Sequence, residues 1–200
     1  MSQAAVSRLA GTDQSAAPPA FGFWVYLMTD CVVFATLFAT FVVLRNNTFG
    51  GPAGSELFSL PYALALTLVL LTSSLTAGLA LLAARRGHFK RLVQWLGVTL
   101  VLGLVFLSLE LYEFVQLYQE GNSWRRSGFL SAFFTLVGTH GAHITAGLLW
   151  MGILMAQWWR KGLGRSGLKR ITMLALFWHF LDIIWIFIFS IVYLMGVAAP

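Results

Sequence analysis

The stretch Phe177 to Met195, which reads FWHFLDIIWIFIFSIVYLM, decides the fold of this 200-residue chain. It is long and apolar enough to cross a membrane as one helix. It also contains two ionisable side chains, His179 and Asp182, which share one face of a helix because they lie three residues apart. Such groups cost roughly 2.5 to 3.5 kcal/mol each in hydrocarbon, so they normally face other helices or a wet cavity. We therefore predict a membrane helix that packs against other helices with polar groups of their own.

The composition predicts an all-α, polytopic membrane protein. Hydrophobic residues make up 58% of the chain and charged residues 10%, and the mean hydropathy is +0.79. The net charge of +6 is a feature of many nucleic-acid-binding proteins, but the basic residues lie between the apolar stretches and do not follow one face. We therefore expect no nucleic acid among the partners. The single cysteine, Cys31, lies inside an apolar stretch, so there is no disulfide framework.

The apolar stretches predict one bundle of five transmembrane helices that occupies residues 21–200. The expected spans are residues 22–44, 60–84, 92–118, 131–159 and 171–197. Residues 1–20 are rich in Ser, Ala, Gln and Pro and carry no separate cleavage signal, so we expect a disordered cytoplasmic tail and an uncleaved first span.

The basic residues predict the orientation of the bundle. Five spans place the two termini on opposite sides of the membrane. If the N-terminus is cytoplasmic, ten of the 13 Lys and Arg residues lie on the cytoplasmic side, and Arg45, Arg125 and Arg126 lie opposite. An excess of basic residues marks the cytoplasmic side, so we expect a cytoplasmic N-terminus and a periplasmic C-terminus.

The ionisable residues inside the spans are the candidate site. They are Asp30, Glu110, Glu113, His140, His143, His179 and Asp182. At about 1.5 Å of rise per residue, they fall into two groups by depth. We expect Asp30 to meet the face that carries His179 and Asp182, the face of Glu110 and Glu113 to meet His140, and His143 to lie between the groups.

Three interpretations compete for these residues. Paired histidines with carboxylates resemble the ligands of a metal or haem site, but no span has the Glu-x-x-His spacing of a helical di-iron site. Acid and imidazole chains also build proton or solute pathways, but the chain lacks the broken helices and inverted repeats of transporters. We favour the third, in which the residues form helix-to-helix pairs that line a lipid-filled crevice. On that basis we expect no catalytic residue, cofactor ligand or metal ligand in this chain.

Three segments carry a resemblance to a known family. They are FGFWVYLMTDC at Phe21 to Cys31, RSGFLSAFFTLVGTHGAH at Arg126 to His143, and LFWHFLD at Leu176 to Asp182. They resemble subunit III of the haem-copper respiratory oxidases, and within that family the branch of the cytochrome o ubiquinol oxidases. The similarity extends from about Phe21 to Gly196.

This resemblance implies an accessory, non-redox subunit of a proton-pumping terminal ubiquinol oxidase, which reduces oxygen to water. Such a subunit supports assembly, lipid binding and sustained turnover of the catalytic subunit. Its expected partners are the catalytic subunit I, which would hold haem B, haem O and copper, subunit II, a small subunit IV, and membrane lipids that include bound phospholipid. The expected location is the bacterial inner membrane, which the chain crosses several times. The first alternative is subunit III of a bacterial cytochrome c oxidase. A second, which the resemblance supports less, is an independent membrane metalloenzyme or transporter.

The resemblance also implies which residues form the site. Asp30, Glu113, His140, His143, His179 and Asp182 are expected to form the intramembrane polar network, whereas Glu110 has no matching family position and is left out. Seven-helix relatives have a Ser-Glu step where this chain has Thr29-Asp30, whose carboxylate is one methylene shorter. The chain starts at the equivalent of their third helix, so it corresponds to the five-helix form of the subunit.

Overall fold

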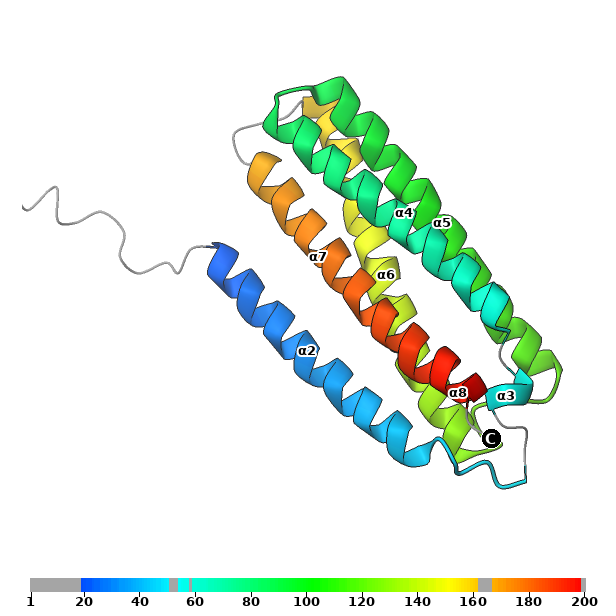
Figure 1. Cartoon of the computed structure of the whole chain (residues 1–200). Coiled ribbons are helices and arrows are strands. Elements are labelled where there is room, and N and C mark those ends of the chain that lie inside the picture. Colours follow the sequence, from blue (N-terminus) through cyan, green and yellow to red (C-terminus); the bar gives the residue numbers. More distant parts are fainter. Residues whose placement is uncertain (1–18, 51–53, 58, 162–166, 199–200) are drawn as a thin grey trace, which may run out of the picture.

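The structure, a computed structural model, describes residues 19–50, 54–57, 59–161 and 167–198, and these are helical wherever they are regular. Figure 1 shows the elements in chain order. They are α2 (Pro19–Leu44), α3 (Gly54–Leu57), α4 (Leu60–Arg85), α5 (Phe89–Gln119), α6 (Gly128–Lys161), α7 (Gly167–Ile188), the π-helical η1 (Phe189–Leu194) and α8 (Met195–Ala198). A long helix is present at each of the five predicted spans, whereas residues 1–18 of the predicted tail lie outside the described residues.

Four of the long helices can cross a membrane by length and apolarity. They are Phe21–Leu44, Leu60–Arg85, Phe89–Gln119 and Gly167–Val197. The fifth, α6, has 34 residues but is less apolar, because its middle carries His140 and His143 together with several glycines. The chain is therefore a membrane protein with an all-helical fold.

The helices begin and end at local signals that the sequence contains. α4 and α5 each end on a left-handed glycine, Gly87 at φ 73° and Gly121 at φ 81°. The residue after each glycine donates its N–H back to the last turn, from His88 to the Ala83 carbonyl and from Asn122 to the Leu117 carbonyl, both at 2.9 Å. Only glycine adopts this conformation without steric cost, so these positions set the ends of α4 and α5.

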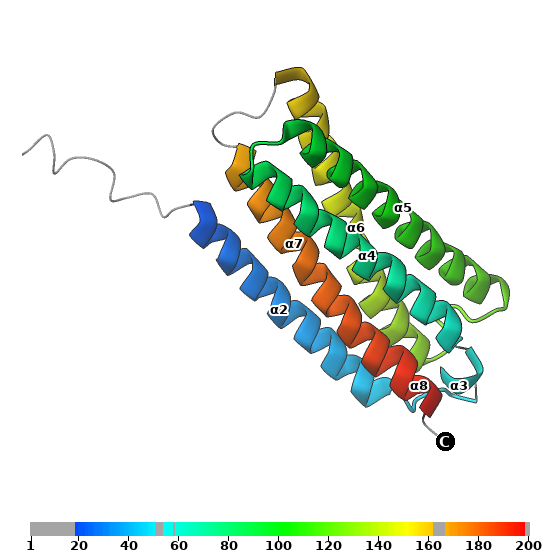
Figure 2. The ribbon, with the colours of Figure 1, turned by 45° about the horizontal axis from the view of Figure 1, so that its top comes forward.

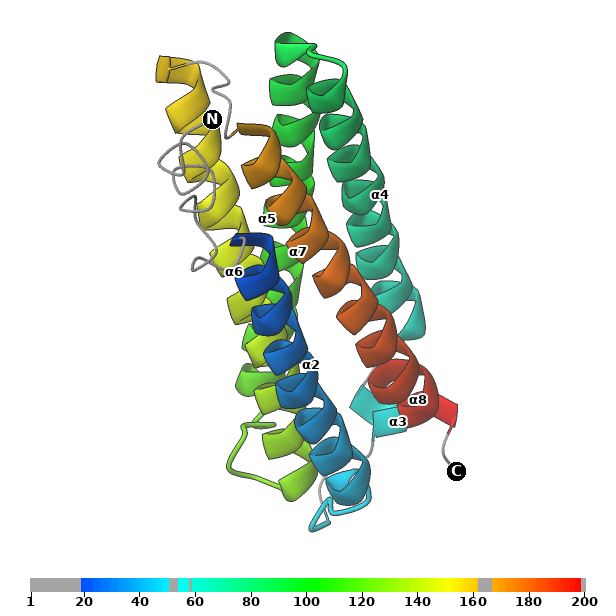
Figure 3. The same ribbon diagram turned by 90° about the vertical axis from the view of Figure 1, so that its left-hand side faces the viewer.

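The bundle is built around α6 and α7. α4 and α5 pack against each other as an antiparallel pair, α7 packs on α4 and α6, and α6 packs on α5. α2 packs mainly on α6 and also on α7, and it lies on the side of α7 away from α4 and α5 (Figures 1 and 2). Figure 3 shows α2 in front of the other helices, with its length alongside α6 and α7. The first helix is therefore the peripheral one, and α6 joins it to the rest.

Trp178 shows how closely the central helices approach. Its ring is fully buried between two glycines, and a Cβ atom added to Gly103 of α5 or Gly147 of α6 would lie 2.9 Å or 3.1 Å from it. The indole N–H donates to the Ser73 hydroxyl of α4 at 3.1 Å. A buried indole N–H needs such an acceptor, so this single side chain ties α7 to three neighbouring helices.

Candidate functional site

The carboxylate of α2 meets a histidine of α6. Asp30 is buried, and its Oδ2 lies 3.3 Å from His143 Nε2. The other ring nitrogen, His143 Nδ1, lies 2.7 Å from the Thr139 carbonyl oxygen. Since a carbonyl only accepts hydrogen bonds, Nδ1 carries a proton and Nε2 faces the Asp30 carboxylate, whose Oδ2 has no hydrogen-bond partner in the described part of the chain. The contact therefore brings an acid of α2 against an imidazole of α6.

This pairing corrects the sequence-based expectation, which placed Asp30 against the face of His179 and Asp182. Depth alone did not identify the partner, because residues at similar depth occur on several helices. The order of the helices decides it, since α2 packs mainly along α6 and less on α7. His143, which was expected between the two groups, is the residue that Asp30 contacts.

His179 and Asp182 of α7 do share one helix face, as their spacing predicted. His179 Nδ1 lies 3.5 Å from Asp182 Oδ2, and the same nitrogen lies 2.7 Å from the Ser74 hydroxyl of α4. Asp182 is 5% exposed, and neither carboxylate oxygen has a hydrogen-bond partner in the described part of the chain. His179 therefore makes its shorter contact with the Ser74 hydroxyl of α4, and Asp182 lies farther from the imidazole.

The two glutamates of α5 have different surroundings. Glu113 Oε2 accepts a hydrogen bond of 2.9 Å from the Tyr193 hydroxyl in η1. Glu110 packs against Gly141, where a Cβ atom would lie 3.1 Å from Oε1, and neither Glu110 oxygen has a partner among the described residues. A π-helical turn changes the register of a helix, and η1 is where Tyr193 is buried and reaches Glu113.

His140 is surrounded by aromatic rings. It is fully buried and stacks on Trp185 with ring centroids 5.4 Å apart, and it meets Phe106 edge to face with ring centroids 6.1 Å apart. Neither ring nitrogen has a hydrogen-bond partner in the described ranges. The expected contact of His140 with the Glu110 and Glu113 face is not among the contacts of either glutamate. Glu113 pairs with Tyr193, and the neighbour of Glu110 on α6 is Gly141.

Hydroxyl groups of α4 and α5 form a second set of polar contacts that sequence reasoning missed. Trp185 donates to the Thr67 hydroxyl at 3.0 Å, and the Thr76 and Thr99 hydroxyls lie 2.8 Å apart. The candidate residues predicted from the sequence are all ionisable, whereas these hydroxyl groups are not. The missed signal is the pair of tryptophans in the last span, because each buried indole N–H must find an acceptor on a neighbouring helix.

The polar side chains thus form separate contacts, each at a different junction. Asp30 joins α2 to α6, His179 joins α7 to α4, and Glu113 joins α5 to η1. Within the described residues, no group of three or more His, Cys, Asp or Glu side chains is placed to hold a metal ion. The arrangement can fix helices against one another.

Comparisons with known proteins agree with the resemblance in the sequence. Residues 12–197 match the family described as cytochrome c oxidase subunit III. The chain is 56% identical over 176 residues to cytochrome bo(3) ubiquinol oxidase subunit 3 of Pseudomonas aeruginosa, a match that covers 88% of this chain and 84% of the relative. It is 46% identical over 175 residues to cytochrome c oxidase subunit 3 of Bacillus sp. PS3 (88% and 84% covered) and to quinol oxidase subunit 3 of Bacillus subtilis (88% and 86% covered).

Proposed function

Since this chain belongs to the cytochrome c oxidase subunit III family, we propose that it serves as the non-redox subunit 3 of a proton-pumping ubiquinol oxidase. The observation that carries the proposal is the 56% identity, over most of both chains, to a protein named as subunit 3 of a ubiquinol oxidase. In this role the chain supports the assembly and sustained turnover of a catalytic subunit I, which holds haem B, haem O and copper. Subunit II and a small subunit IV complete the complex, which reduces oxygen to water.

The six network residues act by holding the bundle in shape. Charge-assisted contacts between helices are strong in a membrane, because the alternative is an unpaired polar group in hydrocarbon. The contact between Asp30 and His143 supports this role, since it joins the peripheral α2 to α6. The remaining members of the network are Glu113, His140, His179 and Asp182. Acting at separate junctions, these six residues together shape the bundle and a crevice for membrane lipid.

All five long helices cross the bacterial inner membrane in this proposal. α6 is the fourth of these spans in chain order, and its 34 residues, about 50 Å of helix, pack on α2, α5 and α7. The N-terminus is cytoplasmic and the C-terminus periplasmic, which puts the basic loops after α4 and α6 in the cytoplasm.

The test is purification of the complex through an affinity tag on this chain. We expect co-purified subunits with haem B, haem O and copper by pyridine haemochrome and elemental analysis, and rapid oxidation of ubiquinol. The chain purified alone should contain no stoichiometric iron, copper or zinc. A metal near one per chain that is lost on replacing His140 or His143 would favour a metalloenzyme.

The 46% identity to a cytochrome c oxidase subunit 3 supports a second candidate, in which the electron donor is cytochrome c. The same preparation separates the two. Oxidation of reduced cytochrome c without oxidation of ubiquinol would contradict the ubiquinol oxidase assignment.

A further inference from the structure

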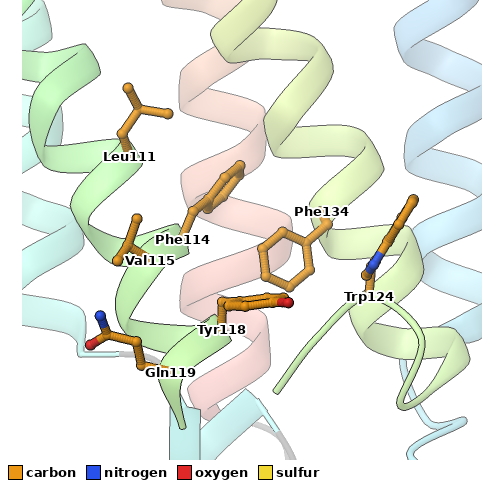
Figure 4. A pocket seen from close by; sticks show the side chains of 7 residues that line it. All are labelled: Leu111, Phe114, Val115, Tyr118, Gln119, Trp124 and Phe134. Atoms are coloured by element: carbon orange, nitrogen blue, oxygen red, sulfur yellow. The ribbon is translucent and has the colours of Figure 1, made fainter. Parts of the chain in front are cut away.

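A groove between α5 and α6 has no part in the proposed function. Figure 4 shows the side chains around it, among them Phe114 and Tyr118 of α5, Trp124 of the connecting loop, and Phe134 of α6. Its volume is about 570 Å³. This lies within the range of about 300 to 1,000 Å³ that small-molecule sites occupy, so the groove is large enough to hold part of a ligand.

The floor of the groove consists of packed aromatic rings. The Phe114 and Phe134 rings meet edge to face with centroids 5.0 Å apart, and Phe114 also lies 6.0 Å from Phe133. The edges of the groove are open, since Tyr118 is 67% and Trp124 58% exposed. A packed floor with exposed apolar edges is a surface that another apolar group can cover.

No acidic side chain is among the described residues that line the groove, because the two faces of the last turns of α5 differ. Leu111, Phe114, Val115 and Tyr118 have the spacing of one helix face and line the groove. The α5 carboxylates Glu113 and Glu120 line a separate, more polar hollow of about 250 Å³ together with Tyr62 and Gln116. The groove is therefore mainly apolar and has no negative charge among its described lining residues.

A cation is held at the loop end of the groove. The Arg125 guanidinium lies 5.4 Å from the centroid of the Trp124 ring, in position for a cation–π contact. The loop is held by two hydrogen bonds, one from the Ser131 hydroxyl to the Trp124 carbonyl and one of 2.7 Å from the Arg126 side chain to Asn122 Oδ1. Arg125 is exposed, so its guanidinium is available to a phosphate group.

We propose that this groove binds an anionic phospholipid, with an acyl chain along α5 and α6 and the headgroup phosphate at Arg125. The apolar stripe from Leu111 to Tyr118 rises about 10 Å along α5, and the cation lies where the helices end. Tryptophan and tyrosine occupy the headgroup level of membranes, which is where Trp124 and Tyr118 would lie. A helix from a partner subunit would match the apolar stripe but not the cation. The inference requires only that the chain lies in a membrane, so it does not depend on the identity of the oxidase.

Native mass spectrometry of the full-length chain in neutral detergent tests the proposal. Palmitoyl-oleoyl phosphatidylglycerol and the matching phosphatidylcholine would be added at equal concentration. We expect about fivefold greater retention of phosphatidylglycerol, the effect of one basic side chain on an anionic lipid. Arg125→Gln should reduce this retention to the level of phosphatidylcholine. The control Arg91→Gln removes an exposed arginine at the opposite end of α5 and should change nothing.

A second variant tests the acyl chain separately. Val115→Phe adds bulk inside the groove and should reduce the retention of both lipids, while circular dichroism confirms that each variant is folded. Equal retention of the two lipids by the unmodified chain, or unchanged retention in either variant, would overturn the proposal. A photo-crosslinker at position 115 that captures another polypeptide and no lipid in the assembled complex would assign the groove to a partner helix, and would also overturn it.

Discussion

Among the described residues, two contacts join an aspartate and a histidine, and they differ in what they join. Asp30 of α2 meets His143 of α6 at 3.3 Å, so this contact links two helices. His179 and Asp182 lie 3.5 Å apart within α7, one turn from each other. Only the first contact can hold one helix against another. The second is local, and the link from His179 to a neighbouring helix is its 2.7 Å contact with Ser74.

The helices that carry these contacts also differ in their other polar links. α7 is tied to α4 by Trp178 and Trp185, whose indole groups donate to Ser73 and Thr67, in addition to the contact of His179 with Ser74. The hydroxyls of Thr29, Thr36 and Thr40 in α2 donate to carbonyls of α2 itself. We therefore expect the bundle to be more sensitive to loss of the contact at Asp30 than to loss of the contact at Asp182.

His143→Leu should have the largest effect. It leaves Asp30, which is 7% exposed, in an apolar helix junction without its histidine. Breaking a buried pair by removal of one partner costs on the order of 3 kcal/mol of stability. The measurement is the midpoint of SDS-induced unfolding of the purified chain, followed by circular dichroism. The control His88→Leu alters an exposed loop histidine, and an equal loss in both variants would argue against the pair.

His179→Leu should have a smaller effect than His143→Leu but a larger one than Asp182→Leu. It removes the partner of Ser74 and leaves the buried Asp182 without its histidine, at a cost of about 1 to 3 kcal/mol. In Asp182→Leu the imidazole keeps its contact with Ser74. Retention of each variant during affinity purification of the oxidase measures the difference. Equal retention would mean that the two side chains of α7 do not act as a pair.

The double variant Asp30→Leu/His143→Leu should recover most of the stability that His143→Leu loses. Replacing both members of a buried pair by apolar residues leaves no charge unpaired and is often close to neutral. A double-mutant cycle with the same unfolding assay gives the coupling energy directly. If the double variant loses as much unfolding free energy as the two single variants together, Asp30 and His143 have no coupling energy. The contact would then not hold α2 against α6.

Asp30→Ala should have the smallest effect on the initial rate of the complex. If the chain supports the catalytic subunit and carries no protons itself, ubiquinol oxidation and the haem spectrum start unchanged. Inactivation should then come earlier during sustained turnover, because α2 is held less firmly. Proton-to-electron ratios in reconstituted vesicles test this. An immediate fall in the ratio with the subunit still bound would instead indicate a proton-conducting residue.

Much of the fold could be predicted because its signals are local. Apolar length predicted a helix at each span, and the three-residue spacing predicted the shared face of His179 and Asp182. The ends of α4 and α5 follow from Gly87 and Gly121, whose left-handed conformation favours glycine. The family resemblance, carried by short segments of the chain, is confirmed by the comparisons.

The sequence by itself thus determined the helices, the membrane class, the family and the contact inside α7, because each depends on residues close together in the chain. Only the tertiary structure decided that Asp30 meets His143, that Glu113 meets Tyr193, and that Glu110 packs on Gly141. Partner choice between helices depends on which helices are neighbours and how each is rotated about its axis. A local pattern does not encode either quantity, and the π-helical turn at η1 changes the rotation of the last span just where Tyr193 reaches Glu113.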